Sequence, residues 1–210
     1  MSTSTISTTH FEALDEPHRD LKQARTWFFL LHAITMMVTF LGIFALGILY
    51  GRFGRTFLPT KWFRYHRAIQ ITGVVSMVIA AIFAIIAVQL AGAPHFKLLH
   101  QKVGLAVIIL VLLQAAGGQA GHIIRQRHGL RAQNALHVGL GLVIFGLAAW
   151  NVQLGLDIWG WKPAPVWKTI MGAWSIFLAV VYVGGLTLWP SQRREELSRA
   201  AGGEGEPLLR

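Results

Sequence analysis

Residues 62–90 read WFRYHRAIQITGVVSMVIAAIFAIIAVQL, and this stretch decides the class of fold. A helix needs roughly 20 mostly apolar residues to cross the ~30 Å hydrocarbon layer of a bilayer. The run is long enough for that, too long for a β-strand, and lacks the alternation of a half-buried strand. It therefore predicts a transmembrane helix.

Four more apolar runs of spanning length flank this one, at residues 27–50, 98–118, 133–154 and 166–189. The whole chain is 54% hydrophobic and 13% charged, whereas about a quarter of the residues of a soluble domain are charged. We predict an all-α membrane protein with five transmembrane helices, the first four forming a four-helix bundle. Cysteine is absent, which excludes disulfides, thiolate zinc sites, iron–sulfur clusters and a cysteine nucleophile.

Two polar segments border the membrane domain, which we place at residues 27–190. Residues 1–26 are rich in Ser and Thr and lack the apolar core of a signal peptide. Residues 191–210 contain Gly202, Gly203, Glu204 and Glu206. We expect both segments to be disordered tails. No internal repeat is strong enough in the sequence to be used.

The Lys and Arg residues predict the orientation, because positive residues favour the cytoplasmic side. Five spans place the two termini on opposite sides. The amino-terminal side carries seven of these residues: Arg19, Lys22, Arg25, Lys97, Lys102, Lys162 and Lys168. The other side carries twelve: Arg52, Arg55, Lys61, Arg64, Arg67, Arg125, Arg127, Arg131, Arg193, Arg194, Arg199 and Arg210. The amino terminus is therefore expected outside and the carboxyl terminus in the cytoplasm. Basic residues spaced between apolar runs indicate a lipid bilayer as partner, and no nucleic acid.

Four histidines lie within the spans, each a few residues after its span begins: His32, His66, His100 and His137. Ionisable groups at membrane depth are costly and mark function or a buried partner. Since consecutive spans alternate in direction, His32 and His100 are expected near the outer face, and His66 and His137 near the inner face. Ligation of a haem iron by two axial histidines needs this arrangement: two imidazoles at one depth, on alternate helices of a bundle. The alternative is a hydrogen bond from each histidine to a neighbouring helix.

A zinc or di-iron site fits the pattern less well. Its ligands converge on one point and usually include carboxylates or thiolates. The first four runs contain no Asp or Glu. The sequence therefore favours two haem sites, one near each face.

Small and amide residues follow three of these histidines by one helical turn. Gly104 and Gly141 lie four residues after His100 and His137, and so share their faces. A glycine there leaves room for a macrocycle, and close helix–helix packing explains it equally well. Gln70, four residues after His66, is expected to hydrogen-bond either a haem substituent or a neighbouring helix.

Three arginines are expected near the inner opening: Arg64 and Arg67, which flank His66, and Arg131, which precedes His137. Positive charge there would attract an anionic electron donor. Membrane topology, contact with lipid headgroups and a haem propionate are the alternative roles.

The sequence resembles the cytochrome b561 family over residues 27–190, in particular the five-span form found fused to an amino-terminal DOMON domain, here without that domain. The matching pieces are WFRYHRAIQ around His66, HQKVG followed by LLQ from His100 to Gln114, and NALHVGLG followed by NVQLGLDI from His137 to Ile158. The resemblance implies two haem b groups and transmembrane electron transfer. Many members of the family take electrons from cytoplasmic ascorbate and deliver them outside to monodehydroascorbate or ferric chelates.

We therefore expect a transmembrane electron carrier with a cytoplasmic, ascorbate-like donor and an extracytoplasmic acceptor. Whether it is itself an enzyme, of the ascorbate-dependent or ferric reductase type, stays open, as does a homodimer. Two alternatives remain: a haem-bearing anchor subunit of a larger redox complex, and a non-redox transporter or scaffold. A visible spectrum separates the last from the others, and co-purification with a stoichiometric partner identifies the anchor subunit.

Overall fold

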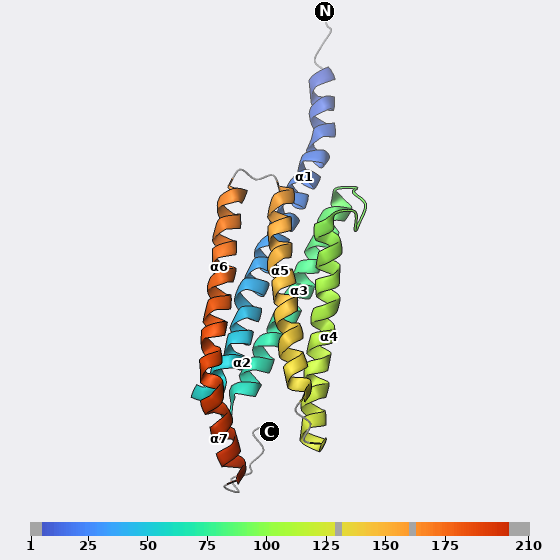
Figure 1. Cartoon of the computed structure of the whole chain (residues 1–210). Coiled ribbons are helices and arrows are strands. Elements are labelled where there is room, and N and C mark those ends of the chain that lie inside the picture. Colours follow the sequence, from blue (N-terminus) through green and yellow to red (C-terminus); the bar gives the residue numbers. More distant parts are fainter. Residues whose placement is uncertain (1–5, 129–131, 160–162, 202–210) are drawn as a thin grey trace, which may run out of the picture.

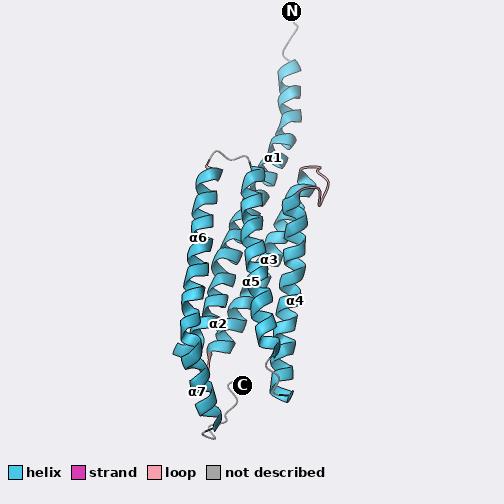
Figure 2. Cartoon of the chain, viewed as in Figure 1, coloured by secondary structure: helices cyan, strands magenta, loops and turns pink. Residues whose placement is uncertain are grey.

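The computed structural model describes residues 6–128, 132–159 and 163–201, and every regular element in these ranges is helical (Figures 1 and 2). The elements follow in this order: α1 (Ile6–Val38), the π-helix η1 (Thr39–Phe44), α2 (Ala45–Phe57), α3 (Trp62–Leu90), α4 (Leu99–His128), α5 (Ala132–Trp159), α6 (Ala164–Gly185), the short 3-10 helix η2 (Leu186–Leu188) and α7 (Trp189–Ala201).

Within the described ranges, five helical segments are long and apolar enough to cross a membrane: Arg19–Phe57, Trp62–Leu90, Leu99–Ile124, Ala135–Trp159 and Ala164–Glu195. The prediction of five transmembrane helices is confirmed, and the chain is an integral membrane protein. The helices continue into both segments expected to be tails, since α1 begins at Ile6 and α7 ends at Ala201. Residues 1–5 and 202–210 lie outside the described ranges.

The breaks between spans are made by residues that suit helix ends. After α3 the backbone of Gly92 adopts a φ of +59°, a left-handed conformation that glycine adopts without steric cost and that often ends a helix. Pro163 directly precedes α6, where its missing N–H costs nothing because the first turn has no partner for it.

The spans pack as antiparallel neighbours. α1 and α2 together form the first span and pack along α3, whereas α4 packs along α5. α6 lies beside α5 and α2 (Figure 1). A buried apolar cluster joins the first four spans at mid-depth and consists of Phe40, Phe44, Met77, Val107, Val111, Ile144 and Ala148.

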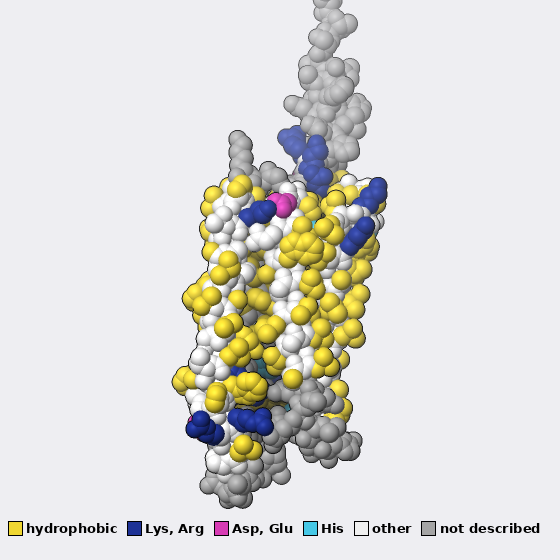
Figure 3. All heavy atoms as spheres, in the orientation of Figure 1, with side chains coloured by type: hydrophobic (Ala, Val, Ile, Leu, Met, Phe, Trp, Pro, Cys, Tyr) yellow, Lys and Arg dark blue, Asp and Glu magenta, His cyan; other side chains and the backbone are white. Residues whose placement is uncertain are grey.

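The face of the bundle seen in Figure 3 is rich in hydrophobic side chains between its two ends. Large side chains such as Val75, Val143 and Ile176 are more than half exposed. Charged side chains gather at the two ends of the same face (Figure 3). This distribution is what a bilayer requires, because hydrocarbon replaces water as the solvent of the middle zone.

The helix at the carboxyl end of the fifth span, α7, is tied to the first span. Gln192 of α7 is 5% exposed, and its Nε2 donates to the Thr56 hydroxyl at 2.6 Å and to the Arg52 carbonyl at 3.2 Å. Arg52 in turn donates from Nε to the carbonyl of Gly185, at the end of α6, at 2.8 Å. These bonds fix where α7 leaves the membrane domain.

Candidate functional site

Two intramembrane histidines from different spans face each other at the end of the bundle where α4 begins. The ring centres of His32, on α1, and His100, on α4, lie 6.1 Å apart, and the ring planes cross at 78°. The structure thus brings together the two residues that helix direction assigns to the outer level.

The other two histidines, His66 of α3 and His137 of α5, lie close enough for their charges to interact. Each follows the start of its own helix, at the opposite end of the bundle from the first pair. The four histidines therefore form two pairs at two levels, each pair on alternate spans.

Three of the imidazoles are held by backbone carbonyls of an adjacent helix. Nδ1 of His32 lies 2.9 Å from the Ala80 carbonyl oxygen, Nδ1 of His66 lies 2.7 Å from that of Gly47, and Nδ1 of His100 lies 3.0 Å from that of Asn151. A carbonyl oxygen only accepts, so Nδ1 carries the proton in each ring and donates it. Nε2 then keeps its lone pair, as a metal-ligating histidine requires.

Glycines make room for three of the rings. A Cβ atom on Gly51 would lie 3.0 Å from Nδ1 of His66, and one on Gly155 would lie 2.9 Å from Cε1 of His100. On α4, a Cβ on Gly118 would lie 2.7 Å from Cε1 of His137. Any larger residue at these positions would displace the ring.

The structure places Gly104 and Gly141 at helix–helix contacts. A Cβ on Gly104 would lie 3.1 Å from Nδ2 of Asn151, and one on Gly141 would lie 2.9 Å from Nε2 of Gln114. Gln114 also donates from Nε2 to the backbone carbonyl of His137. An amide side chain of the facing helix therefore packs against each of the two glycines. Contact of either glycine with a haem stays a prediction.

Gln70 has a corresponding place on the first pair of spans. Its side-chain amide lies against Gly47, where a Cβ would approach Nε2 to 2.6 Å. Gly47 is also the residue whose carbonyl holds His66. Gln70 thus packs beside the support of the inner histidine, and its hydrogen bond to a haem substituent stays a prediction.

The structure adds a basic residue near His66 that the sequence analysis did not single out, Arg55. Arg64 and Arg67 are exposed, and the Arg67 guanidinium lies 5.7 Å from the ring centre of Phe63. Arg55, on α2, interacts electrostatically with His66 and lies 4.4 Å above the Trp62 ring. Arg131 lies outside the described residues.

A layer of buried apolar side chains separates the two histidine levels. On α4, Val107 and Val111 lie between His100 and Gly118, the residue that faces His137. Fourteen residues lead from His100 to Gln114, next to the inner level, and at a rise of 1.5 Å per residue they span about 21 Å. Electron transfer between the levels would pass through this apolar layer.

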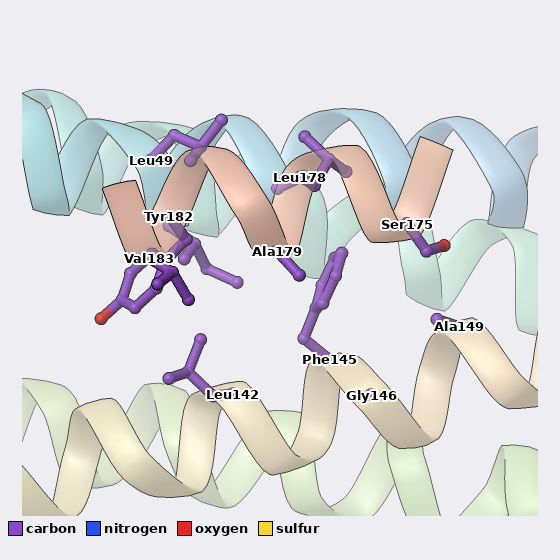
Figure 4. A pocket seen from close by; sticks show the side chains of 12 residues that line it. Leu49, Leu142, Phe145, Gly146, Ala149, Ser175, Leu178, Ala179, Tyr182 and Val183 are labelled. Carbon is purple, nitrogen blue, oxygen red and sulfur yellow. The ribbon is translucent and has the colours of Figure 1, made fainter. Parts of the chain in front are cut away.

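A separate cavity of about 340 Å³ lies between α2, α5 and α6 (Figure 4). Among the described residues that line it, most are apolar, and Ser175 and Tyr182 bring the only side-chain hydroxyls. None of the four histidines lines it. The cavity is therefore distinct from the two histidine levels.

The comparison with protein families decides what these histidines belong to. The family described as eukaryotic cytochrome b561 matches residues 31–161. The chain belongs to the cytochrome b561 family. No curated protein sequence matches it. Membership in the b561 family implies transmembrane electron transfer by haem, with haem b as the cofactor. The match includes all four intramembrane histidines and ends before α6.

The residues of this b561 protein fit a haem with two axial histidines. Metal–imidazole bonds are about 2 Å long, so two ligands of one iron place their ring centres roughly 6 Å apart. The His32–His100 separation of 6.1 Å agrees with this. In the described ranges no three His, Asp or Glu side chains converge as a metal site would need, and a haem held by two imidazoles needs no such cluster.

Sequence analysis of this b561 protein missed the residues that support the histidines: Gly47, Gly51, Ala80, Gln114, Gly118, Asn151 and Gly155. A signal for them exists in the numbering. Gln114 follows His100 by fourteen residues, and Asn151 follows His137 by the same interval; the glycines follow four residues later. The interval identifies supporting residues only once it is known which helices pack against each other.

Proposed function

We propose that the protein carries electrons across the membrane between two b haems. His32 and His100 hold the one near the extracytoplasmic face, and His66 and His137 hold the one near the cytoplasm. The observation that carries the proposal is the pairing of the histidines at two levels, with Nδ1 of His32, His66 and His100 each bound to a carbonyl. The count of two haems rests on this pairing, since the family match implies haem b alone.

A bound haem b supplies a one-electron iron couple. The residues of the chain fix the ligands and set their surroundings. Each Nδ1–H···O=C bond orients its imidazole and raises its basicity as a ligand. The apolar cluster between the levels keeps water out of the space through which the electron passes.

The charge distribution supports the proposed direction of transfer. The sequence assigns twelve Lys and Arg residues to the side of His66 and His137 and seven to the other side, which favours a cytoplasmic location for the inner pair. Exposed Arg64 and Arg67 at this end suit a small anionic donor such as ascorbate. The acceptor would then be extracytoplasmic. An anchor role in a larger redox complex would use the same haems with a protein donor.

The test is a dithionite-reduced minus oxidised spectrum of the purified protein, with a pyridine haemochrome assay for the haem-to-protein ratio. The proposal expects two b haems per chain. Absence of haem would reject it in favour of a transporter or scaffold. One haem per chain would reject the two-site arrangement.

A further inference from the structure

The four spans that carry the histidines form two antiparallel pairs. In each pair, each helix supplies a residue that contacts the histidine of the other. In the first pair, His32 of α1 donates to the carbonyl of Ala80 on α3, and His66 of α3 donates to the carbonyl of Gly47 on α2. Each span thus carries a histidine near one end and the acceptor for its partner's histidine near the other.

The second pair repeats this design. His100 of α4 donates to the carbonyl of Asn151 on α5, and its ring lies against Gly155. In return, His137 of α5 lies against Gly118 of α4, with Gln114 one turn before that glycine. The contact between ring and glycine therefore recurs with the roles of the helices exchanged, and at the inner level α4 also contributes the Gln114 amide, which donates to the backbone carbonyl of His137.

The interval between a histidine and the supporting residue on its own span is constant in three spans. It is fourteen residues in α3, α4 and α5: from His66 to Ala80, from His100 to Gln114 and from His137 to Asn151. In the first span the interval from His32 to Gly47 is fifteen. One extra residue in a regular helix would turn Gly47 by about 100° away from its place.

The first span is also the one that departs from α-helical geometry between these two residues. The π-helix Thr39–Phe44 joins α1 to α2, at the level of the apolar cluster that contains Phe40 and Phe44. A π-turn closes i→i+5 hydrogen bonds, so it holds one residue more than an α-turn. The extra residue is therefore absorbed before the chain reaches Gly47.

We propose that the π-helix is a one-residue insertion that keeps the Gly47 carbonyl in register with His66, and that Trp174 is the positioning residue that stabilises it. Trp174, on α6, donates from Nε1 to the Leu41 carbonyl, inside the π-helix, at 2.9 Å. A π-turn interrupts the regular i→i−4 hydrogen bonds of the backbone. A hydrogen-bond donor from another helix can therefore satisfy a carbonyl group at this point. The fifth span, which bears none of the four histidines, thus contributes to the inner site.

Removal of Gly42 tests the register directly. Gly42 lies within the π-helix and has no side chain, so its deletion removes no side-chain contact. The space beside it is open, since a Cβ atom there would meet nothing within 4 Å. The deletion restores the interval of fourteen and allows a continuous α-helix. We expect two haems per chain, as in the unaltered protein, and the inner component of the spectrum unchanged. Loss of the inner haem, or of the folded protein, would overturn the proposal.

Deletion of Ile109 from α4 is the matched control. Ile109 is 49% exposed and lies at a comparable level, between His100 and Gln114. Its loss shortens that interval to thirteen and turns Gln114 and Gly118 by about 100° relative to His100. We expect the inner haem, bound through His137, to be lost. Retention of both haems in this variant would show that the interval is not what matters, and would also overturn the proposal.

A second experiment needs no haem. Trp174→Phe removes the donor to Leu41, and we expect Tm of the protein to fall by about 2–4 °C, the shift for loss of one hydrogen bond in a chain of this size. With Gly42 also deleted, the π-helix is gone and Trp174→Phe should leave Tm unchanged. An equal fall in both backgrounds would separate Trp174 from the π-helix.

This inference rests on the proposed function, and different experimental results would reject each of them. Absence of haem from the unaltered protein would end the proposed function, whereas the coupling of Trp174 to Gly42 in Tm would still test the register. Loss of haem only when Gly42 is deleted would end the register inference and leave the function intact.

Discussion

His32 on the first span and His100 on the third present their rings to each other at 6.1 Å and almost at right angles. We expect His32→Ala and His100→Ala to abolish the same component of the reduced spectrum and to spare the other, because each removes one of two axial ligands from one site. Low-temperature absorption spectra would show this. His95→Ala serves as control: His95 lies in the loop at the same end and contacts Gln89 and Phe96, and both components should persist. Loss of different components in the two variants would refute the pairing.

The inner pair gives the reciprocal result. We expect His66→Ala and His137→Ala to remove the second component and to leave the first, because these two residues share the opposite level. Potentiometric titration of each variant should therefore show a single remaining transition. If His66→Ala and His100→Ala lost the same component, the assignment by helix direction would be wrong.

Two adjacent glycines of α4 provide a test of how tightly the inner histidine is held. Gly118→Ala places a methyl group 2.7 Å from the His137 ring, and overpacking of this kind costs about 1–3 kcal/mol. We expect lower haem occupancy at the inner site and a lower Tm. At Gly117 a Cβ meets nothing within 4 Å, so Gly117→Ala should bind haem normally. Equal behaviour of the two variants would mean that the ring has room to move.

The attachment of α7 can be measured by proteolysis. Gln192→Leu removes the bonds to the Thr56 hydroxyl and the Arg52 carbonyl, and leaves buried polar groups unpaired at a cost of about 1–3 kcal/mol. We expect trypsin to cleave after Arg193 or Arg194 roughly tenfold faster, since 1.4 kcal/mol corresponds to a factor of ten.

Ser191→Ala is the control for this measurement. The Ser191 hydroxyl donates to the Leu188 carbonyl, three residues earlier in the same span, and its loss should leave the cleavage rate unchanged. A rate in Gln192→Leu equal to that of the unaltered protein would show that α7 is held by other contacts.

Charge at the inner end should govern reduction by an anion. We expect Arg67→Gln to slow stopped-flow reduction of the inner haem by ascorbate severalfold and to leave haem content intact. Added salt should reduce the difference, because the side chain is exposed and its field is screened. Lys102→Gln, at the opposite end of the bundle, is the control. A rate without salt dependence would argue for a neutral or protein donor.

The sequence by itself determined the class of fold and the level of each histidine. Apolar runs as long as Trp62–Leu90 have one stable form in a bilayer, since a helix satisfies its own backbone hydrogen bonds. Alternating directions then fix which end of the bundle each histidine occupies. These inferences need only the length and polarity of segments, which are local properties. The same local pattern did not reveal that the helix of α1 begins as early as Ile6.

Only the tertiary structure decided which groups support the histidines. Asn151 and Gly155 are ordinary residues of an apolar run until α5 lies against α4 and brings them to His100. The interval between histidine and support is present in the sequence, but it could not be recognised there because the supporting residues share a position rather than a residue type. The first span obscures the pattern further, because its interval is fifteen residues. The π-helix that absorbs the extra residue lies where Trp174 of α6 donates to the Leu41 carbonyl. Contacts between distant segments depend on how helices pair, and the pattern of one helix does not contain that information.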